Sequence, residues 1–162
     1  MRNPAVAVAV AITVVAAGCG SDPVPDSTPA GVDRSDPDQV ISTALETMFT
    51  WAPAQDASPN DALERASGLL TSDLAEQAGG APEPGPGSQW EQWRADGAVV
   101  EATAYFVADE TPPNSADRAH RVVVIVQSAT TPDHRLINET RHTAWVVADR
   151  SDGGWRVSSI DF

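Results

Sequence analysis

The segment at residues 121–128, RVVVIVQS, decides the fold of this chain. It is a near-continuous run of apolar, mostly β-branched residues, which is typical of a central strand that is covered on both faces. Three further segments around it favour strands: AVVEATAYFVA at 98–108, TRHTAWVVAD at 140–149 and WRVSSIDF at 155–162. The sequence RSDGG at 150–154 joins the last two and is a hairpin signal, because its glycines adopt positive φ at little cost. We therefore expect about four antiparallel strands.

The residues before these strands predict helices. Asp36-Pro37 and Ser58-Pro59 each combine a capping side chain with a proline suited to the first helical position, and Thr71 is a third cap. The first helix should end near Trp51, and residues 81–89, APEPGPGSQ, should form a loop. Helices followed by strands predict an α+β fold, with the N-terminal helices packed on one face of the sheet.

The N-terminal residues predict export and a lipid anchor. Residues 1–18, MRNPAVAVAVAITVVAAG, hold an apolar run that is too short for a membrane span but has the length of the core of a signal peptide. Small residues precede Cys19, the only cysteine of the chain. This resembles the lipobox of bacterial lipoproteins, although Ala16 stands where leucine is usual. The resemblance implies a diacylglycerol and further acyl chains, such as palmitate, on Cys19. The alternative is an ordinary signal peptide with a chance cysteine.

The composition divides the chain into three parts. Residues 1–18 are the expected signal peptide, residues 19–36 a disordered tether rich in Pro, Ser, Gly and Asp, and residues 37–162 one folded domain. The expected location is the extracytoplasmic face of the cell membrane, where the lipid anchor would hold the domain. Each buried methylene of an acyl chain contributes about 0.8 kcal/mol to such anchoring.

The charge of the chain is strongly acidic and unevenly placed. The chain has 23 acids, ten arginines and no lysine, for a net charge of −13. Residues 37–110 hold 13 acids and only Arg65 and Arg94, whereas residues 111–162 hold six acids and six arginines. Nucleic acid is not an expected partner, because phosphate recognition needs a basic surface. The helical half is either a solvated acidic face or a docking surface for a basic partner.

Five residues of that half are candidates for partner binding. The acidic candidates are Glu64, Asp73 and Glu76, and the aromatic candidates are Trp90 and Trp93, of which either would be an interface anchor if exposed. No cofactor and no metal site are predicted, because no His, Cys or Asp pair has a recognised ligand spacing. The one candidate for proton-transfer chemistry is His142 with Asp109 or Glu110.

The domain also resembles known proteins. Helices before a curved sheet that ends in GWRVSSIDF are similar to the nuclear-transport-factor-2-like (cystatin-like) fold. The segment MFTWAPAQDASPNDALERASGLLTSDLAEQ and the Trp90-Glu-Gln-Trp93 pair resemble small exported proteins of actinobacteria. Those are similar to soluble domains of scaffold proteins in conjugation and type IV secretion machines, and to proteins associated with mammalian-cell-entry transporters. Such scaffolds usually carry a transmembrane helix, where this chain has a lipid signal.

The resemblance implies a non-catalytic accessory or scaffold domain of a membrane-associated secretion or transport complex, whose partners are proteins of the cell envelope. Two alternatives stay open. A large apolar cavity over the sheet would favour a binder of a small apolar ligand. A buried carboxylate with a histidine at the cavity floor would favour an enzyme of the isomerase or dehydratase type.

Overall fold

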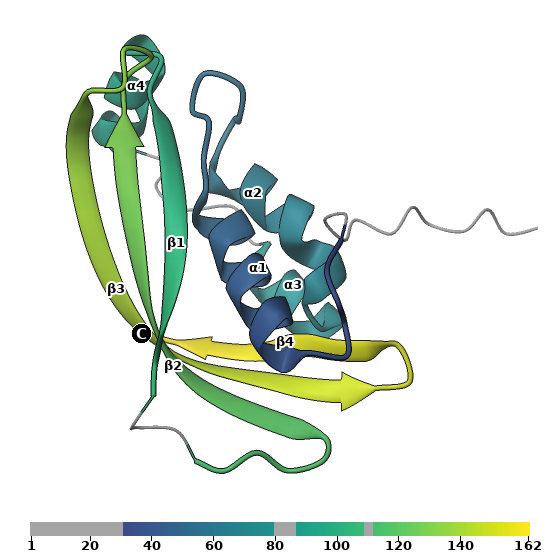
Figure 1. Ribbon diagram of the computed structural model, residues 1–162. Helices are drawn as coiled ribbons and strands as arrows, with labels where there is room; N and C mark the ends of the chain where they lie inside the picture. The colour runs from purple at the N-terminus through teal and green to yellow at the C-terminus, as the bar shows by residue number, and fades with distance from the viewer. Residues whose placement is uncertain (1–30, 80–86, 109–111) are drawn as a thin grey trace, which may run out of the picture.

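The computed structural model describes residues 31–79, 87–108 and 112–162 (Figure 1). Cys19, Asp109 and Glu110 therefore lie outside the described residues, as do the expected signal peptide and most of the expected tether. The elements in chain order are α1 (Pro37–Phe49), α2 (Pro59–Ala66), the short 3-10 helix η1 (Ser67–Leu69), α3 (Ser72–Ala78), α4 (Gly87–Ala95), β1 (Val99–Val107), β2 (Arg118–Thr130), β3 (Leu136–Ser151) and β4 (Gly154–Asp161).

The strands form one sheet in the order β1-β2-β3-β4, and every neighbouring pair is antiparallel. The long strands β2 and β3 bend along their length, so the sheet is strongly curved, and α1 to α3 lie in its concavity (Figure 1). The predicted α+β fold, with helices before a curved antiparallel sheet of four strands, is confirmed.

The predicted helix starts are also confirmed. The side chain of Asp36 accepts a hydrogen bond from the amide of Asp38, Ser58 caps α2 and Thr71 caps α3. Helix α1 ends at Phe49, two residues before the expected end at Trp51. Trp51 instead joins the edge of the sheet, because its amide and carbonyl both bond to Val100 of β1, at 2.8 and 2.9 Å.

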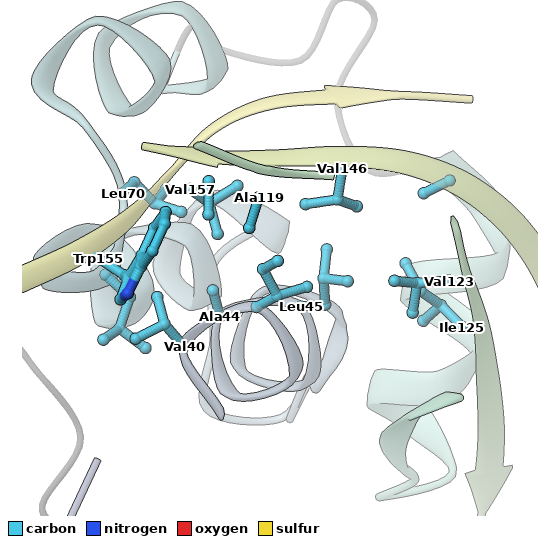
Figure 2. Close-up of a cluster of buried hydrophobic side chains, with 14 of the residues drawn as sticks. Val40, Ala44, Leu45, Leu70, Ala119, Val123, Ile125, Val146, Trp155 and Val157 are labelled. Atoms are coloured by element: carbon cyan, nitrogen blue, oxygen red, sulfur yellow. The ribbon is translucent and has the colours of Figure 1, made fainter. Parts of the chain in front are cut away.

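The core lies between α1 and the concave face of the sheet (Figure 2). Val40, Ile41, Ala44 and Leu45 repeat at helical spacing, which puts them all on the side of α1 that faces the strands. Their strand partners are Val123 and Ile125 of β2, Val146 of β3, and Trp155 and Val157 of β4, and each of these nine residues is at most 5% exposed. The buried side of α1 thus packs on the concave face of the sheet, while a hollow of about 460 Å³ lies between α1 and β1.

The other face of the sheet differs from expectation. Val123 and Ile125 of β2 face the helices and are buried, whereas Val124 between them is only half-buried. Tyr105 and Trp145 flank that strand and are 56% and 52% exposed. The prediction that the 121–128 strand is covered on both faces holds only in part: Val122 on the second face is 3% exposed, but Val124 and Val126 are half-buried. Valine also suits the open side of a pleated sheet, so its presence does not require a second covering layer.

The end of the predicted 81–89 loop is helical. Residues 87–89 belong to α4, while residues 80–86 lie outside the described residues. Helix α4 is fixed by tertiary contacts. Trp90 is 2% exposed and packs on Trp51, and Arg94 donates from Nε to the carbonyl of Pro53 at 2.8 Å. These contacts stabilise α4, although the Gly- and Pro-rich sequence before it does not predict a helix.

The N-terminal end of the described chain also packs on the domain. The carbonyl of Arg34 accepts from the amide of Trp155 at 2.9 Å, and Val32 packs against the core. Gly154, at the end of the β3–β4 turn, has φ +94°, and a Cβ built there would lie 2.7 Å from Arg34 backbone oxygen. Residues 32–34 therefore contact the domain, although their composition places them in the tether.

Candidate functional site

The three predicted acidic residues lie on two helices that contact each other, α2 and α3. Glu64 lies on α2, and Asp73 and Glu76 lie three residues apart on α3, so they share one side of that helix. All three side chains are exposed. The structure thus places this part of the predicted set on exposed positions of one helical pair.

A hollow of about 290 Å³ lies between these two helices. Leu63 and Ala75 give it apolar walls, and Glu64 stands at its rim. Asn60, Ser67 and Gly79 complete the lining. An apolar hollow with an exposed carboxylate at its rim suits a partner that inserts an apolar side chain and carries positive charge next to it.

The arginine that follows Glu64 in the sequence pairs with a different acid. Arg65 turns to Asp56, with Nη1 2.7 Å from Oδ1, and it also donates to the carbonyl of Thr50. Burial raises the pKa of Asp56, but hydrogen bonds from Arg65 and from the amide of Ala52, with the charge of Arg65, outweigh burial and leave the pKa below its usual value. The side chain of Arg65 therefore binds the 50–57 loop.

That loop connects four elements. It follows α1, precedes α2, pairs with β1 through Trp51, and receives Arg94 of α4. Its carboxylate, Asp56, is only 7% exposed and holds the loop closed through the amide of Ala52 at 2.8 Å. The position of α4 relative to the sheet therefore depends on this loop.

The two candidate tryptophans differ in exposure. The ring of Trp90 is 2% exposed, so it is a core residue and does not present a free surface to a partner. Trp93 is half-buried, and its ring lies 6.4 Å from that of Trp51. Both belong to α4 and neither lines the α2–α3 hollow, so the structure does not join them to the acidic candidates.

Only His142 of the candidate proton-transfer pair belongs to the described residues. His142 is exposed on β3, and its ring contacts those of Phe49 and Phe162, at 6.4 and 6.3 Å between centroids. Its proposed partners, Asp109 and Glu110, lie outside the described residues. His120 is half-buried at the start of β2, and His134 is exposed in the β2–β3 turn.

Two further searches cover the described ranges alone. Within residues 31–79, 87–108 and 112–162, no three His, Cys, Asp or Glu side chains gather closely enough to hold a metal ion. In the same ranges, no helix has the length and apolar character that crossing a membrane requires.

Sequence reasoning missed a second hollow, between α4 and the start of β3. Its volume is about 450 Å³, and its lining includes Gln89, Gln92 and Trp93 of α4 and Asp96 directly after that helix. A signal for it was present, because these four residues recur at the spacing i, i+3, i+4, i+7 of one helix face. The spacing went unused because residues 87–89 were assigned to the loop.

Comparison with known proteins gives little support to any family. No protein-family model matches the chain, and no curated protein matches it. Among solved structures, the chain is similar to the intermembrane space region of chloroplast protein ARC6, with 12% sequence identity and a TM-score of 0.44. The similarity covers 76% of this chain and 91% of that chain. A likeness this distant carries no functional argument, and the resemblance to nuclear-transport-factor-2-like scaffold domains stays a prediction.

Proposed function

We propose that this protein is a non-catalytic lipoprotein of the cell envelope, anchored through Cys19, whose α2–α3 surface binds a basic protein of a membrane-associated complex. The observation that carries the proposal is the apolar hollow between α2 and α3, with the exposed carboxylate of Glu64 at its rim. Asp73 and Glu76 are exposed on the same helical pair, and Arg65, which follows Glu64 in the sequence, is held by Asp56.

The packing of the concavity supports this proposal over a binder of apolar ligands. Leu45 and Ile41 of α1 contact the strand residues directly, and none of these side chains is measurably exposed. The protein's own core is packed between the buried side of α1 and the strands (Figure 2). A hollow of about 460 Å³ lies between α1 and β1, but its lining is mostly threonine and charged side chains, which do not suit an apolar ligand.

Site-specific photo-crosslinking in the native membrane tests the proposal. A photoreactive residue at Gln77, which is exposed on α3, should give a defined protein adduct, and one at Ser128 on β2 should not. The variant Glu64→Arg/Asp73→Arg/Glu76→Arg should lose the adduct while remaining folded. The control Glu91→Arg/Glu101→Arg/Glu139→Arg makes the same change of charge at exposed sites of α4 and the sheet and should keep it.

Salt gives a second readout. Exposed charges are screened beyond about 8 Å at physiological ionic strength, so the yield of the adduct should fall as salt rises. Equal loss in both triple variants would show that net charge alone matters and would contradict a docking surface on α2–α3. Loss of cellular function on His142→Ala, in a folded protein, would favour proton-transfer chemistry instead.

A further inference from the structure

We infer that the hollow between α4 and the start of β3 binds a neutral saccharide. The inference is independent of the proposed docking function, because its residues do not overlap those of the α2–α3 hollow. Figure 1 shows α4 at the far end of the sheet from α3. The volume of about 450 Å³ is within the range of about 300–1,000 Å³ that small-molecule sites occupy.

The lining has the chemistry that a sugar needs. Sugar hydroxyls both donate and accept hydrogen bonds, and the side-chain amides of Gln89, Gln92 and Asn138 do the same. Asp96 adds a carboxylate that only accepts, and Ile137 adds an apolar contact. Arginine is absent from the described lining, which disfavours phosphate, sulfate and uronate ligands.

Trp93 supplies a stacking surface for the C–H face of a sugar ring. Its ring is half-buried and is held by Trp51, whose centroid lies 6.4 Å away. Trp51 is in turn fixed by two backbone bonds to Val100. An aromatic ring that is held in place before binding loses little conformational freedom when the ligand arrives.

The polar groups are also arranged before binding. The amide nitrogen of Gln92 donates to both carboxylate oxygens of Asp96, each at 3.1 Å. This leaves the amide oxygen of Gln92 as an acceptor next to the carboxylate. Arg94 fixes α4 to the 50–57 loop through Pro53, which holds this face of the helix opposite Asn138 of β3.

A peptide is the less favoured occupant. Peptide segments bind chiefly by adding to a strand edge or by placing apolar anchors in pockets. Here the walls are mostly amide and carboxylate side chains, with one aliphatic residue, Ile137. The side-chain amides of the lining both donate and accept hydrogen bonds, and this character favours a saccharide.

Titration of the purified full-length protein with oligosaccharides tests this inference. The probes are neutral tetramers of N-acetylglucosamine, glucose, galactose and arabinose, with tetragalacturonate and a neutral pentapeptide for comparison. At least one neutral tetramer should bind and shift the indole N–H resonance of Trp93, which is assigned by its loss in Trp93→Phe. Trp93→Ala should weaken binding about tenfold or more.

Two variants guard against a folding defect in Trp93→Ala. Gln89→Ala and Asn138→Ala remove only polar groups of the hollow and should each weaken binding severalfold. Trp145→Ala on the opposite face of the sheet and Gln77→Ala on α3 are the matched controls and should leave binding unchanged. No binding of any neutral tetramer at about 10 mM, binding that all the variants retain, or binding of only tetragalacturonate or the pentapeptide would overturn the inference.

Discussion

Replacing Asp56 by alanine should destabilise the domain more than the loss of an exposed ion pair would. Its carboxylate accepts from the amide of Ala52 at 2.8 Å and from two nitrogens of Arg65, at 2.7 and 3.2 Å. The side chain of Asp56 is 8% exposed, whereas that of Arg65 is 46% exposed. Removal of the carboxylate therefore leaves a part-buried amide without its partner, while water can solvate the guanidinium again.

These contacts set the size of the effect. An unsatisfied amide costs about 1–3 kcal/mol, and a hydrogen bond to a half-exposed arginine contributes about 1 kcal/mol after solvation is discounted. We expect a loss of about 2–4 kcal/mol in the free energy of unfolding, or roughly 10 °C in Tm. Urea denaturation measures it. The control is Glu91→Ala, which breaks an exposed pair with Arg94 and should cost less than about 0.5 kcal/mol.

The pH dependence checks the cause. Because the pKa of Asp56 is lower in the folded than in the unfolded protein, its contribution is fully present above the unfolded value, about 3.9. This contribution to stability is lost as the pH falls through the pKa that Asp56 has in the folded protein. The stability difference between wild type and the isosteric Asp56→Asn should therefore shrink below pH of about 4. A difference in unfolding free energy between wild type and Asp56→Asn of less than about 0.5 kcal/mol at neutral pH would refute this reasoning. A difference that stays the same in acid would also refute it.

Three further outcomes are expected. Cys19→Ser should release the protein from membranes and abolish labelling by a radioactive fatty acid, as measured by cell fractionation; an unlabelled wild type with a membrane-bound variant would contradict the lipid anchor. Limited proteolysis should leave a resistant fragment that begins at about residue 31, because Val32 and Arg34 contact the domain, and a fragment that retains residues 22–30 would contradict the tether. Gly154→Ala should lower the unfolding free energy by about 2 kcal/mol or more, because φ is +94° and the new Cβ would meet Arg34; an unchanged urea midpoint would rule out that contact.

The sequence predicts those elements that depend on local chemistry. Asp36, Ser58 and Thr71 cap their helices as expected, since a cap needs only its own side chain and the next few amides. Helix α4 was missed because its position depends on Trp51 and Pro53, which are distant in sequence. The open face of the sheet was missed because strand propensity alone cannot tell how many layers cover a strand.

In the candidate sites, too, local spacing predicts some features and tertiary packing decides the others. Exposure of Glu64 and Glu76 follows from helical periodicity, and the structure agrees. The hollow beside them needs α3 to fold back against α2, which no local spacing specifies. Helical periodicity could not predict that Trp90 is buried and Trp93 is half-buried, because both rings pack near Trp51 and their exposure depends on how α4 lies on the rest of the domain.

The placement of the two hollows relative to the chain's entry point argues for different partners. Arg34 bonds to Trp155 beside the β3–β4 turn and donates to the carbonyl of Gly68, next to the α2–α3 surface. Asn138, which lines the hollow between α4 and the start of β3, lies twelve residues before Arg150 in the bent strand β3. At 3.3 Å per residue, the length of strand between these two residues is about 40 Å. If Cys19 carries the proposed lipid, the α2–α3 surface would lie on the side of the domain where the chain arrives from the membrane, within reach of an envelope complex. The Trp93 hollow would then lie toward the other end of the domain, where an extracytoplasmic polysaccharide would have access to it.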